Sequence, residues 1–489
     1  MVDVPSFDKL FIGGKWVEPA SDKRFELHSP TTGELLASAP EAVEADAEKA
    51  LAAARDAFDN GPWPRMSASE RGVIIRKFHD LFIENSNELA ELITAEVGAP
   101  LLFSHFGQIG AAGFVLDYYA NLVNSFEFES VRDGMLGPVI VRKEPVGVVV
   151  GIVPWNVPIF ITMLKLAPAL ASGSTIVLKP SPETPISVLR LAQLIEEAGI
   201  PEGVVSVLPA GREVGEYLVS APGVDKVSFT GSTPAGRKIG AVCGELLRRC
   251  TLELGGKSAA ILLPDADIAE VAPQLVPYGI MNNGQACVAQ TRILVPRSRY
   301  DEAVEAFTKV VSGLTVGDPN SFEIEVGPLI AERQRDRVES YIAKGLAEGA
   351  RITAGGGRPE GFDNGWFVEP TLFVDVDNKM TIAQEEIFGP VLALIAYDDV
   401  DDAVAIANDS DYGLSGSVWG PDVDVAADVA RRVRTGTVSV NGFAMEWSAP
   451  FGGFKNSGVG RELGPEGLSA FLEDKAIALP AGAEPKLKY

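Results

Sequence analysis

The sequence predicts an α/β protein built around a doubly wound parallel sheet. From Val146 onward, short apolar segments rich in β-branched residues alternate with segments of helical periodicity. The predicted strands are apolar on both faces, as in parallel sheets covered by helices. The chain has 489 residues, more than the roughly 250–300 that one hydrophobic core supports. A second α/β region is therefore expected beside the first sheet, and residues 126–143 and 471–480 look like strands with no domain of their own.

The first sheet is expected in the part of the chain that follows residue 144. Its strands and helices alternate without interruption, so consecutive strands are parallel and their carboxyl ends share one edge. Ligands of such sheets bind at that edge. The expected strands are 146–153, 175–178, 204–208 and 226–229, and the expected helices are 184–197, 214–219 and 233–242.

A second α/β region is expected from Ser258 onward. Before the first sheet, residues 43–120 carry Ala, Glu and Leu at helical spacing and should pack on that sheet. In the second region strands are expected at 259–263, 292–295, 391–396 and 414–418, a helix at 268–281, and further helices from Tyr300 and Ala331. The expected domains are 1–125 with 144–255, then 256–455, and an arm of 126–143 with 471–489.

Composition excludes several classes of function. Asp and Glu number 67 against 42 Lys and Arg, giving a net charge of −25, which disfavours nucleic acid and anionic lipid as partners. No apolar run is long enough to span a membrane, and no basic and apolar secretory signal begins the chain. We therefore expect a cytoplasmic protein.

The Cys and His residues do not have the spacing of a metal site. The three cysteines, Cys243, Cys250 and Cys287, contain no Cys-x-x-Cys pair, and the three histidines lie far from them in sequence. We expect neither a disulfide framework nor a bound metal. Cys243 and Cys250 are interpreted as packing residues.

Cys287 is the most informative residue of the chain. It follows the polar, glycine-bearing run Asn282-Asn283-Gly284-Gln285, which is typical of a loop at a site and not of a buried packing cysteine. A thiol attacks a carbonyl only as the thiolate, and an ordinary Cys with a pKa of about 8.5 is mostly protonated at neutral pH. Glu253, in a short run between Leu252 and Leu254, offers a carboxylate base. A pairing of Cys287 with one of the distant histidines is the less favoured alternative.

Several longer segments, in order and spacing, resemble the aldehyde dehydrogenase superfamily. They are Pro154-Trp155-Asn156-Val157-Pro158, Lys179-Pro180-Ser181, Phe229-Thr230-Gly231-Ser232, Leu252 to Lys257, Asn282 to Arg292, and Glu385 to Pro390. The resemblance runs nearly end to end. It implies a Rossmann-like cofactor-binding domain, a catalytic domain and an oligomerisation arm, and hence a homodimer or homotetramer.

The resemblance also implies a mechanism in which an aldehyde is oxidised to the acid with NAD or NADP. Cys287 would attack the aldehyde, and the Asn156 amide with the backbone N–H of Cys287 would stabilise the oxyanion. Glu253 would activate the water that hydrolyses the thioester. Members that pass the acyl group to coenzyme A lack a carboxylate at this position, so Glu253 implies water as the acceptor.

The cofactor residues are likewise carried over by resemblance. No Gly-x-Gly-x-x-Gly motif follows a strand, and a Walker A pattern around Lys257 fails because Thr251 occupies the position of its first glycine. NAD-preferring members often carry an acid three residues after the lysine, where this chain has Pro182 followed by Glu183. NAD is favoured, with NADP left open. The expected cofactor residues are Ile152, Pro154, Trp155, Lys179, Ser181, Glu183, Gly211, Gly215, Phe229, Thr230, Gly231, Ser232, Leu254, Gly255, Glu386 and Phe388.

By the same resemblance the substrate tunnel is apolar, which favours a hydrophobic aliphatic, terpenoid or aromatic aldehyde. Core packing is the alternative explanation of these residues. Two other functions stay open from the sequence: a thiol acyltransferase or hydrolase that needs no nicotinamide, and a catalytically silent structural or binding protein. The expected tunnel residues are Val157, Ile161, Leu164, Met445 and Trp447.

Overall fold

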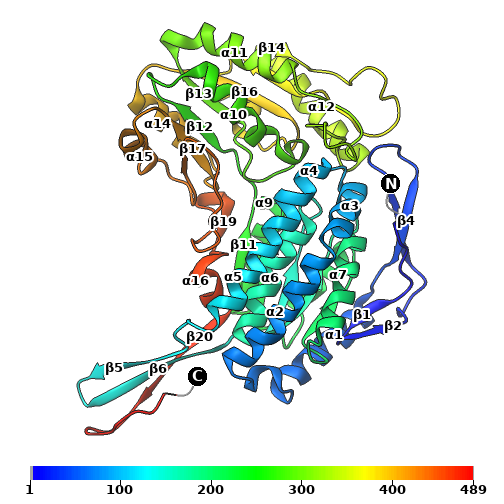
Figure 1. Cartoon of the computed structure of the whole chain (residues 1–489), viewed down its shortest axis with the longest axis vertical. Coiled ribbons are helices and arrows are strands. Elements are labelled where there is room, and N and C mark those ends of the chain that lie inside the picture. Colours follow the sequence, from blue (N-terminus) through cyan, green and yellow to red (C-terminus); the bar gives the residue numbers. More distant parts are fainter. Residues whose placement is uncertain (1–3, 488–489) are drawn as a thin grey trace.

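The structure, a computed structural model, describes residues 4–487; residues 1–3 and 488–489, at the ends of the expected first domain and arm, lie outside the described residues. The α/β prediction is confirmed. Two large sheets, each covered by helices, lie one above the other, and a three-stranded arm projects from the lower one (Figure 1). The residue boundaries of the expected domains stay a prediction.

The first sheet has eight strands, and its five central strands run parallel. The chain passes from β7 through β8 to β9 on one side, then returns to lay β10 and β11 on the other side of β7. The order reverses between β7 and β10, which is where ligands bind in open α/β sheets. In sheet order the strands are β19 (Gly458–Val459), β11 (Arg249–Glu253), β10 (Lys226–Thr230), β7 (Val148–Ile152), β8 (Thr175–Lys179), β9 (Val205–Val207), β1 (Leu10–Ile12) and β2 (Lys15–Val17).

Helices cover both faces of this sheet, as its apolar strands require. All fifteen residues of α6 are buried, because it lies between the sheet and the N-terminal helices (Figure 1). The helical prediction for 43–120 is confirmed, apart from a π-helical turn at Ser104–Gly110 that periodicity did not indicate. The helices are α1 (Glu44–Asp59), α2 (Ala68–Glu84), α3 (Ser86–Val97), α4 (Leu101–Phe103), α5 (Ala111–Leu122), α6 (Pro158–Ser172), α7 (Pro185–Ala198), α8 (Arg212–Ser220) and α9 (Thr233–Glu245), with a 3₁₀ turn at Trp63–Arg65.

The second sheet has seven strands, and only β14 runs antiparallel to its neighbour. In sheet order they are β14 (Arg351–Ala354), β15 (Thr371–Val374), β16 (Val391–Tyr397), β13 (Arg292–Pro296), β12 (Ala259–Leu262), β17 (Gly416–Trp419) and β18 (Ser439–Val440). Its helices are α10 (Ile268–Ile280), α11 (Tyr300–Ser312), α12 (Glu332–Ala347), α13 (Thr381–Gln384), α14 (Val400–Asn408) and α15 (Val423–Ala430), with 3₁₀ turns at Met281–Gly284 and Arg297–Arg299.

The arm is an antiparallel sheet of β5 (Glu129–Gly134), β6 (Gly137–Pro145) and β20 (Leu472–Ala478), at the lower left of Figure 1. The strands expected at 126–143 and 471–480 are thereby confirmed. Met135 and Leu136, at the tip, are 98% and 83% exposed. A separate hairpin joins β3 (Arg24–His28) to β4 (Leu35–Pro40). Within residues 4–487, no helix is long and apolar enough to cross a membrane.

The chain after the second sheet returns to the first sheet. A 3₁₀ turn at Lys455–Ser457 leads into β19, which pairs antiparallel with β11 so that Gly458 lies opposite Glu253. Helix α16 (Gly464–Ser469) then packs near α6 and leads into β20. The domains predicted from the sequence did not include residues 456–470. Their return covers the strand end that carries Glu253.

Candidate active site

Cys287 lies on a loop that reverses direction directly after α10. Asn282, Asn283 and Gly284 have φ of +54°, +61° and +74°, in the left-handed region that asparagine and glycine tolerate best. A Cβ at Gly284 would lie 2.1 Å from the backbone of Gly389, so only glycine fits there. This explains why the run before Cys287 contains these residue types.

Side-chain amides anchor the loop on both sides. The Nδ2 of Asn283 donates to the carbonyls of Gly98 and Pro328, at 2.9 and 2.8 Å. The Oε1 of Gln285 accepts a hydrogen bond from the N–H of Ile330 at 3.1 Å. Because buried amides with all these bonds are costly to move, the Cys287 backbone is held in one place.

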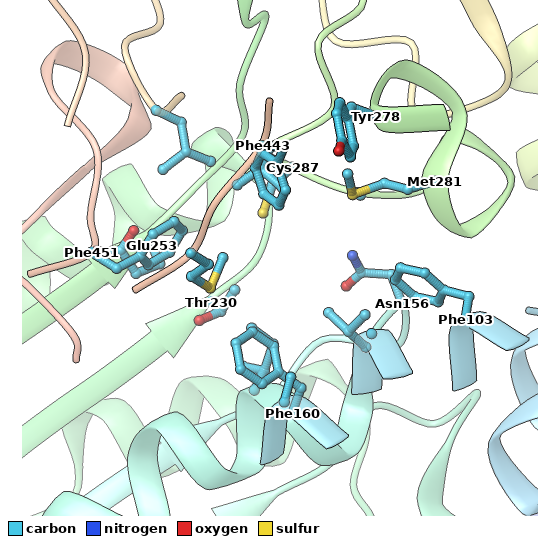
Figure 2. Close-up of a pocket in the computed structure, with 18 of the residues that line it drawn as sticks. Phe103, Asn156, Phe160, Thr230, Glu253, Tyr278, Met281, Cys287, Phe443 and Phe451 are labelled. Carbon is cyan, nitrogen blue, oxygen red and sulfur yellow. The ribbon is translucent and has the colours of Figure 1, made fainter. Parts of the chain in front are cut away.

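Asn156 joins this loop from the first sheet. It follows β7, is 5% exposed, and its Nδ2 donates to the carbonyl of Gln285 at 2.8 Å. Asn282 in turn donates from Nδ2 to the carbonyl of Asn156 at 2.9 Å. An amide has two N–H donors, and the Asn156 amide faces the same cavity as Cys287 (Figure 2).

Glu253 ends β11 and faces Cys287 across this cavity (Figure 2). Neither carboxylate oxygen accepts a hydrogen bond from the described residues, although the N–H of Gly453 comes near. Burial, followed by the negative charge of Glu462, raises the pKa of Glu253 well above its usual value. A desolvated carboxyl of this kind is a stronger base than one in water.

A buried ion pair lies behind Glu253. The Nζ of Lys165 donates to Glu462 Oε1 at 2.8 Å and to Thr230 Oγ1 at 2.7 Å, and both charged side chains are at most 1% exposed. Lys165 partly offsets the effect of Glu462 on the pKa of Glu253.

The Cys287 thiol is held in its neutral form. Burial raises its pKa to about 12, and the carboxylates of Glu386 and Glu253 contribute in the same direction, against the lowering effect of the backbone N–H groups of Cys287 and Val288. The nearby N–H groups are positioned to stabilise negative charge at the sulfur or on an oxygen attached beside it.

One side of the site opens into an apolar cavity of about 430 Å³. Four of the expected tunnel residues, Val157, Ile161, Met445 and Trp447, lie in its wall. Leu164 does not: it is fully buried in the hydrophobic core, because it points from α6 toward the packed interior. That placement corrects the expectation for Leu164.

The other side opens into a more polar groove of about 640 Å³, which meets the cavity at Cys287, Asn156 and Thr230. Trp155 and Phe388 face each other edge to face, with ring centroids 5.3 Å apart. Of the expected cofactor residues, this groove is lined by Pro154, Trp155, Thr230, Gly231, Ser232, Leu254, Gly255, Glu386 and Phe388.

A further hollow of about 630 Å³ continues past Ser232 and Pro234, at the amino end of α9. It is lined by the expected residues Ile152, Lys179, Gly215, Phe229 and Ser232. Ser181, Glu183 and Gly211 lie outside the walls of both hollows. Ser181 donates a hydrogen bond from its hydroxyl to Glu183, and Gly211 is the N-cap residue directly before α8.

The two hollows have the chemistry to hold a dinucleotide. Lys179 uses two of its three N–H donors on the carbonyls of Pro180 and Ala210; the third is available to a ligand hydroxyl. A Cβ at Gly255 would lie 2.5 Å from the Glu386 carboxylate, and that carboxylate accepts from Gly256 N–H at 3.0 Å. The free amino end of α9 between the hollows suits a pyrophosphate.

Comparison with known proteins agrees with this geometry. The model of the Aldehyde dehydrogenase family matches residues 16–477. The chain belongs to the aldehyde dehydrogenase family. It is 46% identical over 471 residues to geranial dehydrogenase of Castellaniella defragrans, covering 96% of this chain and 98% of that one.

Solved structures of family members are also similar to this aldehyde dehydrogenase. A Mycobacterium tuberculosis aldehyde dehydrogenase complexed with NAD+ has a TM-score of 0.97 at 51% identity, covering 99% of this chain and 100% of that one. Aldehyde dehydrogenase C of Pseudomonas syringae, a cysteine-to-alanine mutant in complex with NAD+ and octanal, has a TM-score of 0.94 at 41% identity, with 98% of each chain covered.

The sequence missed much of the cavity wall of this aldehyde dehydrogenase. The missed residues are aromatic or flexible and come from four separate parts of the chain, so no local pattern could assemble them. The π-helical turn and its flanks supply three of them, and π-helical turns often occur at functional sites. The missed wall residues include Phe103, Phe106, Phe114, Phe160, Tyr278, Met281, Phe443 and Phe451.

Proposed function

We propose that this aldehyde dehydrogenase oxidises a hydrophobic aldehyde to its carboxylic acid with NAD, using water as the acyl acceptor. The observation that carries the proposal is the meeting of Cys287, Asn156 and Glu253 where an apolar cavity joins a polar groove. Neither hollow alone would bring together an aldehyde and a redox cofactor. Their junction at one sulfur does.

The first step is attack of Cys287 on the aldehyde carbon. The thiol gives its proton to a water molecule as the carbon–sulfur bond forms, and the carbonyl oxygen gains the negative charge. The Asn156 amide and the backbone N–H of Cys287 stabilise that oxygen. One such donor typically contributes about 2.7–4 kcal/mol. Lys179, Glu386 and the amino end of α9 would hold NAD, which would supply the hydride acceptor for the oxidation.

The second step is hydrolysis of the thioester left on Cys287. Glu253 lies across the cavity from the sulfur and takes a proton from water as the water attacks the acyl carbon. The carbon–sulfur bond breaks, the acid leaves, and the sulfur recovers a proton from Glu253, which returns to its carboxylate form. The raised pKa of Glu253 supports this role, because it makes the carboxylate a stronger base toward water than an ordinary glutamate.

The wall of the cavity supports the choice of substrate. Phe114 stacks on Trp447 at 5.9 Å, and Phe160 meets the same ring edge to face at 6.1 Å. A charged substrate tail would lose its hydration against these rings without compensation. Geranial and octanal, named with two of the similar proteins, are apolar aldehydes of the kind that the cavity fits.

The groove supports NAD as the cofactor. Lys179 and Glu386 provide a donor and an acceptor for the two ribose units, and the amino end of α9 lies between them. Similar proteins are known in complex with NAD+. Glu183, one position later than the acid of NAD-preferring relatives, would act against a 2′-phosphate.

The test is a panel of saturated, branched and aromatic aldehydes with NAD or NADP, read as NADH or NADPH formation. We expect turnover with NAD, lost in Cys287→Ser, and a thioester on Cys287 in mass spectrometry of the quenched enzyme. Turnover that survives Cys287→Ser would overturn the proposal. Light scattering tests the expected homodimer or homotetramer formed through the arm; a monomer at all concentrations would refute that part.

A further inference from the structure

An ion pair bridges the two halves of the molecule beside the dinucleotide groove. The Nη2 of Arg333, at the start of α12, donates to Oε1 of Glu183, in the loop between β8 and α7. Glu183 belongs to the first sheet and Arg333 to the helices of the second. The side chain of Glu183 is 27% exposed and that of Arg333 is 56% exposed.

Arg333 is a wall residue of the groove, whereas its partner is not. The groove wall includes Arg333 together with Gly231 and Ser232. Burial lowers the pKa of Lys179 to about 8, and the charge of Glu183 offsets part of this lowering. The Glu183 carboxylate therefore lies near the lysine that would bind the adenosine ribose. Glu183 therefore has two cations near it: Lys179, in the wall of the further hollow, and Arg333, in the wall of the groove.

We propose that Arg333 is a residue that determines cofactor specificity, and that Glu183 masks it from the 2′-phosphate of NADP. This inference rests on the proposed function and adds to it a residue, Arg333, whose charge is masked by Glu183. With the ion pair formed, Glu183 occupies guanidinium donors of Arg333 and offsets its positive charge, so Arg333 offers little attraction to a phosphate dianion. Without the carboxylate, Arg333 becomes a cation in the groove wall with a geometry suited to bidentate phosphate binding.

The Arg333–Glu183 pair makes a directional prediction that a role for Glu183 alone would not make. If Glu183 acted alone, its replacement by Gln would remove repulsion whether or not Arg333 were present. If Arg333 is a masked phosphate site, the gain for a 2′-phosphate depends on Arg333. Arg333→Gln alone should strengthen discrimination against the phosphate, because it leaves the Glu183 charge without its partner.

The experiment measures binding of 5′-AMP and 2′,5′-ADP, two adenosine probes that differ by the 2′-phosphate. Calorimetry gives the dissociation constants for wild type, Glu183→Gln, Arg333→Gln and the double variant, without aldehyde or turnover. We expect wild type to prefer 5′-AMP. Glu183→Gln should shift the ratio toward 2′,5′-ADP by about tenfold or more, and the double variant should lose most of that shift. Raising salt should weaken the shift, since it depends on charge.

The Glu339–Arg358 pair is a matched control. It is an Arg–Glu ion pair that also involves α12, its side chains are 32% and 52% exposed, and neither residue lines the groove. Glu339→Gln and Arg358→Gln should leave the probe ratio unchanged. Thermal unfolding without ligand checks that every variant is folded.

The outcomes separate this inference from the proposed function. Equal probe ratios for Glu183→Gln and the double variant would overturn the role of Arg333. Wild-type protein that binds neither NAD nor 5′-AMP would overturn the proposed cofactor site itself. If the protein binds NAD but the substitutions leave the ratio of the two dissociation constants unchanged, the inference about Arg333 is overturned and the proposed function is not.

Discussion

Replacing Asn156 by Ala tests whether its amide stabilises the oxyanion or only holds the Cys287 loop. The amide donates one hydrogen bond to the protein, to the carbonyl of Gln285 at 2.8 Å. That carbonyl also accepts from Asn282 Nδ2 at 3.2 Å, so the variant does not leave it unpaired. The variant should therefore lose roughly 0.5–1.5 kcal/mol of its free energy of unfolding, the contribution of one ordinary hydrogen bond.

The catalytic cost should be larger. Loss of one oxyanion donor costs about 2.7–4 kcal/mol, a fall of roughly 100–1000-fold in turnover. Steady-state kinetics with a saturating apolar aldehyde measures the fall, and NADH binding with thermal unfolding measures the structural part. We expect kcat to fall by this factor while the dissociation constant of NADH changes by less than about threefold.

Asn282→Gly is the matched control. It removes the other amide bound to the Gln285 carbonyl, and glycine keeps the φ of +54°. Asn282 is not part of the cavity wall, so turnover should fall by less than about tenfold. Equal losses in the two variants, or unchanged turnover in Asn156→Ala, would refute the oxyanion role and leave loop positioning as the explanation.

Four further predictions follow from the site. Glu253→Gln should form about one NADH per active site in rapid-quench kinetics and then stall; loss of activity with no burst places the base elsewhere. Because the pKa of Glu253 is raised, the folded chain keeps a proton above about pH 4.3 that the unfolded chain releases, so the stability contributed by this site falls as pH rises. Glu253→Gln should therefore raise the thermal unfolding midpoint more at pH 8 than at pH 5. An equal effect at both pH values would contradict the raised pKa. Iodoacetamide labelling of Cys287 without cofactor should rise about tenfold per pH unit between pH 7 and 10, because the pKa is raised to about 12; a plateau below pH 9, with Cys287→Ser as the blank, would contradict it. Trp447→Ala should lower kcat/KM about tenfold or more for octanal and little for acetaldehyde, since it removes the ring on which Phe114 stacks; an equal loss for both aldehydes would show that the ring does not contact the substrate tail.

Local sequence patterns were sufficient for the regular elements. The runs around Val148–Ile152 and Thr175–Lys179 are β-branched and largely apolar, and both are fully buried strands. Their ends differ from the expected ones by only a residue or two. A strand that is buried on both faces is apolar at nearly every position, so it can be recognised in the sequence as a continuous apolar run.

The cavity wall could not be predicted to the same extent. Leu164 and Ile161 lie one helical turn apart on α6, and only the second reaches the cavity. In a helix whose every residue is buried, hydrophobicity carries no information about which face meets the core and which meets a hollow. The choice depends on the helices packed against it.

By itself, the sequence determined the α/β class, the order of the elements and the residue types around Cys287, because these depend on local periodicity and on backbone conformations that only Asn and Gly adopt easily. Tertiary structure alone decided three things: that β19 returns to cover Glu253, that Glu462 and Lys165 lie behind that carboxylate, and that Arg333 pairs with Glu183 beside the groove. The partners are 150 residues apart in the pair Glu183–Arg333 and 297 apart in the pair Lys165–Glu462. Contacts at such separation arise from the packing of whole sheets, and no local pattern in the chain encodes them.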